Sequence, residues 1–128
     1  MLANTEVMAT IAVRDIAAAR AFYGEVLGLQ ENPVGGDAEG EVLCYLSGSS
    51  QIMVYRSEYA GTNKATSATW TVADEIDEIV TALKAKGVAF EHYEMPGLRL
   101  EGDIHVGEQM KVAWFKDTDG NILSIAGN

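Results

Sequence analysis

The sequence predicts an α+β fold of two tandem βαβββ modules, for three reasons. First, the segments 8–29 and 67–88 resemble each other at a constant offset of 59 positions, which indicates an internal repeat. Second, each segment begins with alternating apolar residues and continues with apolar residues at helical spacing. Third, each is followed by short apolar runs separated by turn-forming residues. We expect a single domain over 1–128, with module one at about 5–57 and module two at about 66–128.

The first module is predicted to begin with a strand at 9–13, where apolar residues occupy every second position. Asp15 follows this strand and predicts a helix N-cap, because its carboxylate can accept backbone N–H groups. The helix is expected to end at Gly28, since glycine adopts the left-handed C′ conformation readily. Two strands are then expected at 41–46 and 51–55, joined by a turn.

The second module repeats this order, with an alternating strand at 68–72, a predicted N-cap at Asp74 and a helix end at Gly87. Three further strands are expected at 88–93, 110–115 and 122–126. The segment 97–107 is rich in glycine and mixed in charge, and we interpret it as a mobile rim loop.

The composition restricts the function. Nineteen acidic residues against nine basic ones give a net charge of −10. Such a charge argues against nucleic acid and anionic membrane surfaces as partners, since both require basic patches, and it favours a cationic ligand. A single cysteine, Cys44, rules out a disulfide framework. We see no membrane span or signal peptide and expect a cytoplasmic protein.

The order of motifs resembles one family. Val-x-Asp-Ile, Ala-Phe-Tyr and Val-Leu-Gly-Leu within 13–29, with the closing Trp-Phe-Lys-Asp-Thr-Asp-Gly-Asn-Ile-Leu-Ser-Ile of 114–125, resemble the vicinal oxygen chelate superfamily. This superfamily includes glyoxalase I, extradiol dioxygenases and bleomycin-resistance proteins. The resemblance implies that the two modules form a curled mixed sheet around a U-shaped groove, with the helices outside. It also implies a homodimer.

The resemblance further implies four positions for metal ligands, which in this chain are Met8, Met53, Ser67 and Ser124. The position at Met53 has a register uncertainty of one residue, which would give Val54. None of the four is a normal ligand for the divalent metals that imidazole and carboxylate groups hold. We therefore predict neither a metal nor another cofactor.

Strand alternation predicts which side chains line the groove. If Ile52 and Val54 face their helix, Met53 and Tyr55 face the groove, and motif position places Trp114 there rather than Phe115. The predicted ligand-binding residues are Met8, Thr10, Met53, Tyr55, Ser67, Thr69, Trp114 and Ser124. His92 and His105 are interpreted as surface residues of strands or loops, and they are the candidates for acid–base catalysis if catalysis occurs.

Two functions follow from these residues. In the first, the protein is a metal-independent binding protein of the glyoxalase/bleomycin-resistance type, which sequesters an aromatic or cationic small molecule in a groove at a homodimer interface. In the second, it is a glyoxalase-like or dioxygenase-like enzyme with a divergent metal site or acid–base catalysis. A divalent metal is expected only in the second case. The sequence leaves open whether the protein is an enzyme.

Overall fold

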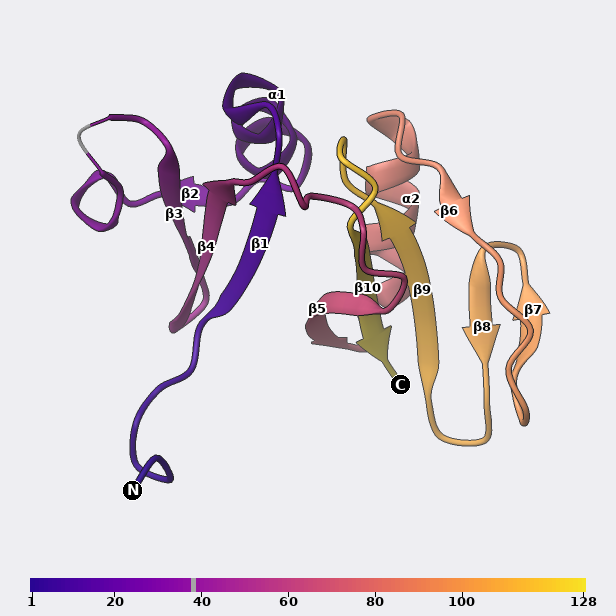
Figure 1. Cartoon of the computed structure of the whole chain (residues 1–128). Helices are drawn as coiled ribbons and strands as arrows, with labels where there is room; N and C mark the ends of the chain where they lie inside the picture. Colours follow the sequence, from indigo (N-terminus) through magenta and orange to yellow (C-terminus); the bar gives the residue numbers. More distant parts are fainter. Residues whose placement is uncertain (38) are drawn as a thin grey trace. The chain divides into compact units, whose positions relative to one another are not determined.

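The computed structural model describes residues 1–37 and 39–128, and these form two compact units, Met1–Thr62 and Asn63–Asn128 (Figure 1). Each unit contains one sheet and one principal helical segment; the first follows the order of a βαβββ module, and the second has the same order with a hairpin of two strands, Arg99–Glu101 and Ile104–Val106, added. The α+β fold class is confirmed, and the elements of each unit position its own part of the candidate site. No helix in the described ranges is both long and apolar enough to cross a membrane.

The first unit has a four-stranded sheet in the order β1-β4-β3-β2. Strands β1 and β4 are parallel, whereas β3 pairs antiparallel with both β4 and β2. Its elements are β1 (Ala9–Val13), α1 (Ile16–Arg20), η1 (Ala21–Val26), β2 (Gln30–Glu31), η2 (Pro33–Gly35), β3 (Val42–Ser47) and β4 (Ser50–Arg56).

The helical segment of the first unit begins as predicted and then widens. Asp15 caps it, since its Oδ1 accepts the backbone N–H of Ala18 at 3.0 Å. After α1 the chain continues in π-helical geometry, with Leu27 N–H donating to the carbonyl of Phe22 five residues earlier. Gly28, at φ 74°, ends the segment in the left-handed conformation. The apolar spacing predicted the helix but not this wider turn.

The core of the first unit lies between the helical segment and one face of the sheet. Successive residues of each strand point to opposite sides of the sheet. One side packs against the helical segment, and the opposite side is called the open face. The buried residues from the strands are Ile11, Val13, Leu43, Tyr45, Ile52 and Val54. Those from the helical segment are Ala19, Phe22 and Tyr23. The predicted inward orientation of Ile52 and Val54 agrees with their burial.

The second unit has a six-stranded sheet in the order β5-β10-β9-β8-β7, and β6 also pairs with β9. Only the β5–β10 pair is parallel. Its elements are β5 (Thr66–Ala73), α2 (Ile76–Ala85), β6 (Phe90–Glu91), β7 (Arg99–Glu101), β8 (Ile104–Val106), β9 (Lys111–Lys116) and β10 (Ile122–Gly127). Helix α2 packs on this sheet through Ile76, Val80 and Leu83, which are buried together with Ala113, Phe115, Leu123 and Ile125.

Three sequence expectations for the second unit are corrected. The segment 97–107 is not a loop: it forms the β7–β8 hairpin, whose turn contains Gly102 at φ 63°. The predicted strand 88–93 is reduced to β6. Asp74 does not cap α2, because Ala73 turns the chain at φ 51° and the helix begins one residue later, after Glu75, with no side-chain cap.

Candidate functional site

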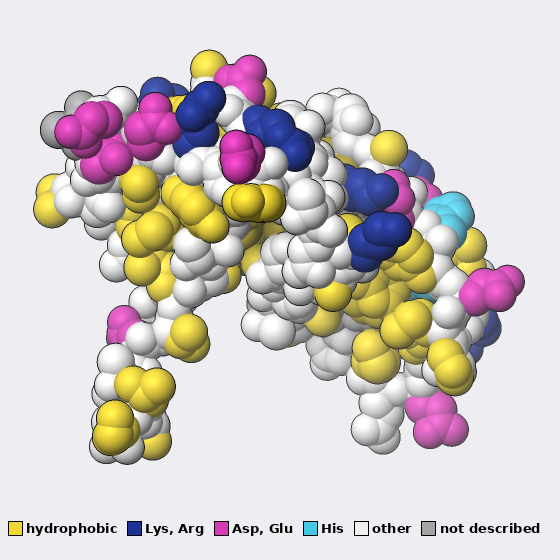
Figure 2. Space-filling model, viewed as in Figure 1, with side chains coloured by type: hydrophobic (Ala, Val, Ile, Leu, Met, Phe, Trp, Pro, Cys, Tyr) yellow, Lys and Arg dark blue, Asp and Glu magenta, His cyan; other side chains and the backbone are white. Residues whose placement is uncertain are grey.

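The predicted groove residues lie mainly on or beside the open face of each sheet, the face opposite the helical segment. In the first unit, the strand register places Met53 between Thr10 on β1 and Cys44 on β3. Directly paired residues point to the same face, so these three side chains share it. Tyr55 lies two positions further along β4 and is 36% exposed. Figure 2 shows hydrophobic side chains gathered over β3 and β4 and along the N-terminal segment.

Met8 lies immediately before β1 and is 38% exposed. It lines a shallow pocket of about 450 Å³ together with Gln51 of β4 and with residues 5–7 and 49–50. The pocket is formed by the chain entering β1 and the β3–β4 turn. Met8, at the entry to β1, and Met53, within β4, therefore both belong to the first unit.

Cys44 has a free thiol and is buried on this face of the sheet. Its Sγ lies 2.9 Å from Oε1 of Gln51, and Gly35 of η2 covers it from the outside. A side chain at Gly35 would collide with the thiol. The same glutamine oxygen lies 3.4 Å from Nδ2 of Asn32, which also donates its backbone N–H to the carbonyl of Cys44. The 33–36 turn thus closes one side of the open face.

In the second unit, Ser124 of β10 pairs with Thr69 of β5 and with Trp114 of β9. The Thr69 and Ser124 hydroxyl oxygens lie 2.7 Å apart, and Ser124 is only 3% exposed. This row corresponds in register to Thr10, Met53 and Cys44 of the first unit. The two predicted positions Met53 and Ser124 are therefore equivalent in the two sheets.

A β-bulge changes the expected place of Ser67. Thr66 pairs with Ile122 and Ala68 pairs with Leu123, so one extra residue, Ser67, lies between them on β5. Without the bulge, Ser67 would pair with Ile122, which is the position that Thr66 occupies instead. The hydroxyl of Thr66 accepts the Trp114 indole N–H at 3.2 Å. The sequence missed Thr66 because a bulge leaves no mark in the apolar pattern.

Trp114 is the centre of an aromatic cluster on the second sheet. Tyr93 lies edge to face with it, at 5.4 Å between ring centroids, and His105 does so at 4.8 Å. Both arrangements are favourable for aromatic rings. With its indole N–H bound to Thr66, Trp114 is fixed on three sides while remaining partly exposed. It can offer a π surface to a ligand.

His105 is not a surface residue, contrary to expectation, because only 2% of it is exposed. Its Nε2 accepts the backbone N–H of Tyr93 at 3.0 Å, and its Nδ1 is buried with no hydrogen-bond partner among the described residues. A proton acceptor for a substrate needs an accessible ring nitrogen. His105 therefore has the environment of a packing residue that holds Tyr93 beside Trp114.

His92 is exposed, as expected, and belongs to a charged cluster with Asp103 and Lys84. Its Nε2 lies 2.8 Å from Oδ1 of Asp103, and Lys84 Nζ lies 2.6 Å from the other carboxylate oxygen. The hydrogen bond from Lys84, followed by that from His92, lowers the pKa of Asp103 below its ordinary value. The cluster connects the β7–β8 hairpin to α2.

The four residues that the sequence resemblance assigned to metal-ligand positions, Met8, Met53, Ser67 and Ser124, do not have the chemistry that a divalent metal requires. Two are thioethers and two are hydroxyls, whereas such metals take imidazole, carboxylate or thiolate ligands. The hydroxyl of Ser124 is already within hydrogen-bond distance of Thr69. Within 1–37 and 39–128, no group of three or more His, Cys, Asp or Glu side chains is arranged to hold a metal ion.

Comparison with known proteins identifies related sequences and folds. The family model described as Glyoxalase/Bleomycin resistance protein/Dioxygenase superfamily matches residues 6–125. No curated protein matches the chain.

Many solved structures share the fold. A lactoylglutathione lyase from Agrobacterium tumefaciens is 17% identical, with a TM-score of 0.69 over 97% of this chain and 94% of that one. A glyoxalase/dioxygenase from Nostoc punctiforme is 20% identical, with a TM-score of 0.70 over 98% and 92%. The fosfomycin resistance protein FosX from Listeria monocytogenes is 16% identical, with a TM-score of 0.68 over 98% and 93%. At these identities the likeness shows the fold alone.

Proposed function

The chain belongs to the glyoxalase/bleomycin resistance protein/dioxygenase superfamily, and from this premise we propose that it is a metal-independent small-molecule binding protein. It sequesters an aromatic or cationic ligand in a groove at a homodimer interface. The observation that carries the proposal is the chemistry of Met8, Met53, Ser67 and Ser124. Thioethers and hydroxyls at the positions for metal ligands suit the packing of an organic molecule better than the coordination of an ion.

The aromatic cluster around Trp114 supports the choice of ligand. A partly exposed indole, fixed by Thr66, attracts both aromatic rings and organic cations through its π face. The net charge of −10 raises the local concentration of cations and lowers that of anions. Both effects favour a flat organic cation over a neutral or anionic molecule of the same size.

A fluorescence titration tests this proposal. The probes are a phenanthridinium dye, which is an aromatic cation, and a naphthalene sulfonate, which is an aromatic anion. We expect the cation to quench tryptophan fluorescence saturably and to bind about tenfold more tightly than the anion. Trp114→Phe should weaken binding of the cation. Trp70→Phe is the matched control, because Trp70 pairs with the buried Ile125 and so faces the helix side of the sheet.

Metal analysis separates this function from the enzymatic alternative. Protein purified without chelators or metal-affinity resin should contain far less than one divalent metal per chain. A content of about one metal per chain, retained through dialysis, would overturn the proposal and favour an enzyme with displaced ligands. Failure of both probes to bind saturably would also count against it.

The homodimer is a separate part of the proposal. Its support is the exposure of large apolar side chains in the N-terminal segment and on β3 and β4, namely Met1, Leu2, Val7, Met8, Leu46 and Tyr55. Sedimentation velocity at micromolar concentration should give twice the mass of the chain. A monomer that still binds the phenanthridinium dye would remove the dimer from the proposal while leaving the binding function.

A further inference from the structure

We propose that a pocket at the ends of β1 and β4, in the first unit, binds the oxyanion group of a small molecule, a carboxylate or a phosphate, between Arg14 and Arg56. The pocket has a volume of about 340 Å³ and is lined by Arg14, Arg56, Ser57 and Glu58. It is separate from the open-face residues described above, and the proposal does not depend on the function proposed for them.

The topology brings the two arginines together. Strands β1 and β4 are parallel, with Val13 paired to Arg56, so both strands end at the same edge of the sheet. Arg14 follows β1 directly, and the backbone N–H of Ser57 donates to the carbonyl of Val13 at 2.8 Å. The carboxyl ends of parallel strands commonly form ligand sites in open sheets, because the chain diverges there and leaves a recess.

Arg14 is anchored but its charge is not neutralised. One of its terminal nitrogens donates to the backbone carbonyl of Glu58 at 2.8 Å, which holds the guanidinium at the pocket. Among the described residues, no carboxylate forms an ion pair with it. A guanidinium has five N–H donors in a planar fork that matches an oxyanion, so most of its donors remain available.

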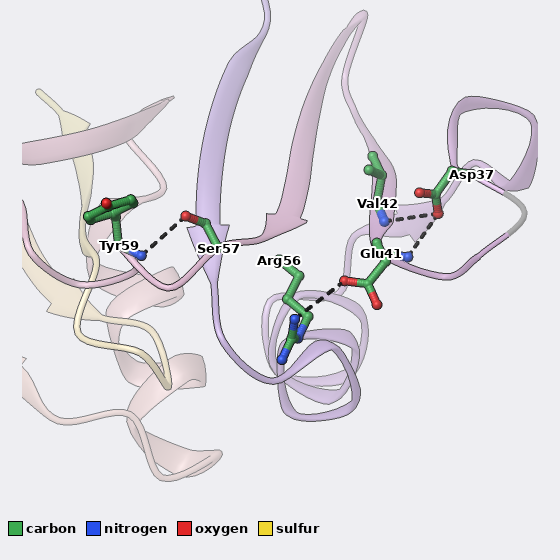
Figure 3. A network of polar contacts seen from close by, with 6 residues as sticks. All are labelled: Asp37, Glu41, Val42, Arg56, Ser57 and Tyr59. Carbon is green, nitrogen blue, oxygen red and sulfur yellow. Dashed lines mark hydrogen bonds and ion pairs between the residues drawn. The ribbon is translucent and has the colours of Figure 1, made fainter.

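Arg56 has only a loose carboxylate partner (Figure 3). Its Nη1 lies 3.8 Å from Oε2 of Glu41, which is too long for a hydrogen bond, and both side chains are more than half exposed. Glu41 is itself held through its backbone N–H by the carboxylate of Asp37. A bound oxyanion can therefore replace water around Arg56 without breaking a short ion pair.

Ser57 adds a hydroxyl donor. Its Oγ accepts the backbone N–H of Tyr59 at 3.2 Å, as Figure 3 shows, so the oxygen is fixed while the hydroxyl hydrogen is free to point elsewhere. Two guanidinium groups and one hydroxyl give the pocket more donors than acceptors, and Glu58 is the one carboxylate among its lining residues. Carboxylates and phosphates are the acceptors that these donors recognise.

The negative charge of Glu58 opposes the binding of an anion. Removing it should therefore strengthen anion binding, whereas removing either arginine should weaken it. Its carboxylate belongs to the residues that line the pocket, and no hydrogen bond or ion pair to it is seen in the described residues. Glu41 is the other carboxylate close to the arginines, 3.8 Å from Arg56, whereas charges farther away than the Debye length, about 8 Å at physiological ionic strength, are largely screened. Removing the charge of Glu58 should therefore tighten binding more than removing a distant carboxylate would.

The test is an NMR titration of the full chain with inorganic phosphate and, separately, acetate, at constant ionic strength. We expect saturable shifts of the Arg14 and Arg56 side-chain N–H signals and of the Ser57 amide. Arg14→Gln and Arg56→Gln should each weaken binding by about tenfold, the effect of losing one charge-assisted hydrogen bond. Glu58→Gln should strengthen it. Arg99→Gln is the control of equal charge change, since Arg99 lies in the other unit and pairs with Glu101.

Saturation by phosphate alone assigns the pocket to a phosphate ligand, and saturation by acetate alone assigns it to a carboxylate. Linear shifts with both probes would overturn the proposal. Equal weakening by Arg99→Gln and Arg56→Gln would do so too, because it would show a long-range effect of charge rather than a site. If Arg14→Gln fails to fold, Glu58→Gln still decides, since that change keeps the backbone bond between Arg14 and residue 58.

Discussion

Gly35 lies so close to Cys44 that a Cβ atom added to the glycine would be 2.6 Å from the Cβ of the cysteine and 2.8 Å from its sulfur. The contact closes the turn of η2 over the open face of the first sheet. Because the chain is held there by the bond between the Asn32 N–H and the carbonyl of Cys44, 2.7 Å long, the turn cannot move away easily. Glycine at 35 is thus required by packing.

Replacing Gly35 by alanine should consequently destabilise the protein. Forcing one methyl group into this contact is expected to cost about 1–3 kcal/mol of unfolding free energy, measured by urea denaturation. Gly24→Ala is the control, since its new Cβ would meet nothing closer than 3.9 Å and would improve a helical segment. Equal stability of the two variants would contradict the packing argument.

The two aspartates that follow β1 and β5 look alike in sequence but should respond differently to mutation. Asp15→Ala removes the bond to the Ala18 N–H and should cost about 1 kcal/mol. Asp74→Ala should change stability by less than about 0.5 kcal/mol, because this exposed side chain caps nothing. Thermal unfolding of both variants measures the difference. A large loss in Asp74→Ala would show that it caps α2 in solution.

Asp103 makes part of the stability depend on pH. Its pKa is lower in the folded protein than the ordinary value of 3.8, through hydrogen bonds from Lys84 and then His92. A carboxylate of this kind stabilises the fold above its unfolded pKa, and the contribution is lost as the pH falls through the folded value. Asp103→Asn should therefore be less stable than the native chain at about pH 6, and the difference should shrink below pH 3.8.

The control uses Lys84→Met, which removes the largest cause of the lowered Asp103 pKa. In a chain that already carries Lys84→Met, Asp103→Asn should cost less unfolding free energy at about pH 6 than it does in the native chain. Unfolding by urea at several pH values provides the measurement. A difference between the native chain and Asp103→Asn that persists at low pH would mean that the side chain acts through packing rather than charge.

His105 should matter for structure far more than His92 does. His105→Leu leaves the Tyr93 N–H without its buried acceptor and should cost about 1–3 kcal/mol. It should also change the near-ultraviolet circular dichroism of Tyr93 and Trp114, because the histidine ring packs against the indole. His92→Leu, at an exposed position, should leave the dichroism unchanged. An unaltered spectrum in His105→Leu would contradict the packing role.

The sequence predicted most of the strands because their apolar periodicity is strong. It failed where that signal is weak. The hairpin at β7 and β8 consists of two three-residue strands joined at Gly102, too short for alternation to show. The turn at Ala73 moved the helix start past Asp74 because local backbone geometry overrides a capping preference. The pocket at Arg14 and Arg56 has no sequence motif, since only the parallel register makes these residues neighbours.

The parallel pairs also determine the order in which the protein can form during synthesis. In each unit the strand that starts the sheet, β1 or β5, pairs in parallel with one made much later, β4 or β10. Neither sheet can form its parallel pair until the later strand has left the ribosome. The chain between the two paired strands is therefore closed into a loop late in synthesis. The first unit can complete its sheet once β4 has emerged. In the second unit β5 stays without its partner until β10 has been made, so this unit has the greater need of chaperones to protect its unpaired strand.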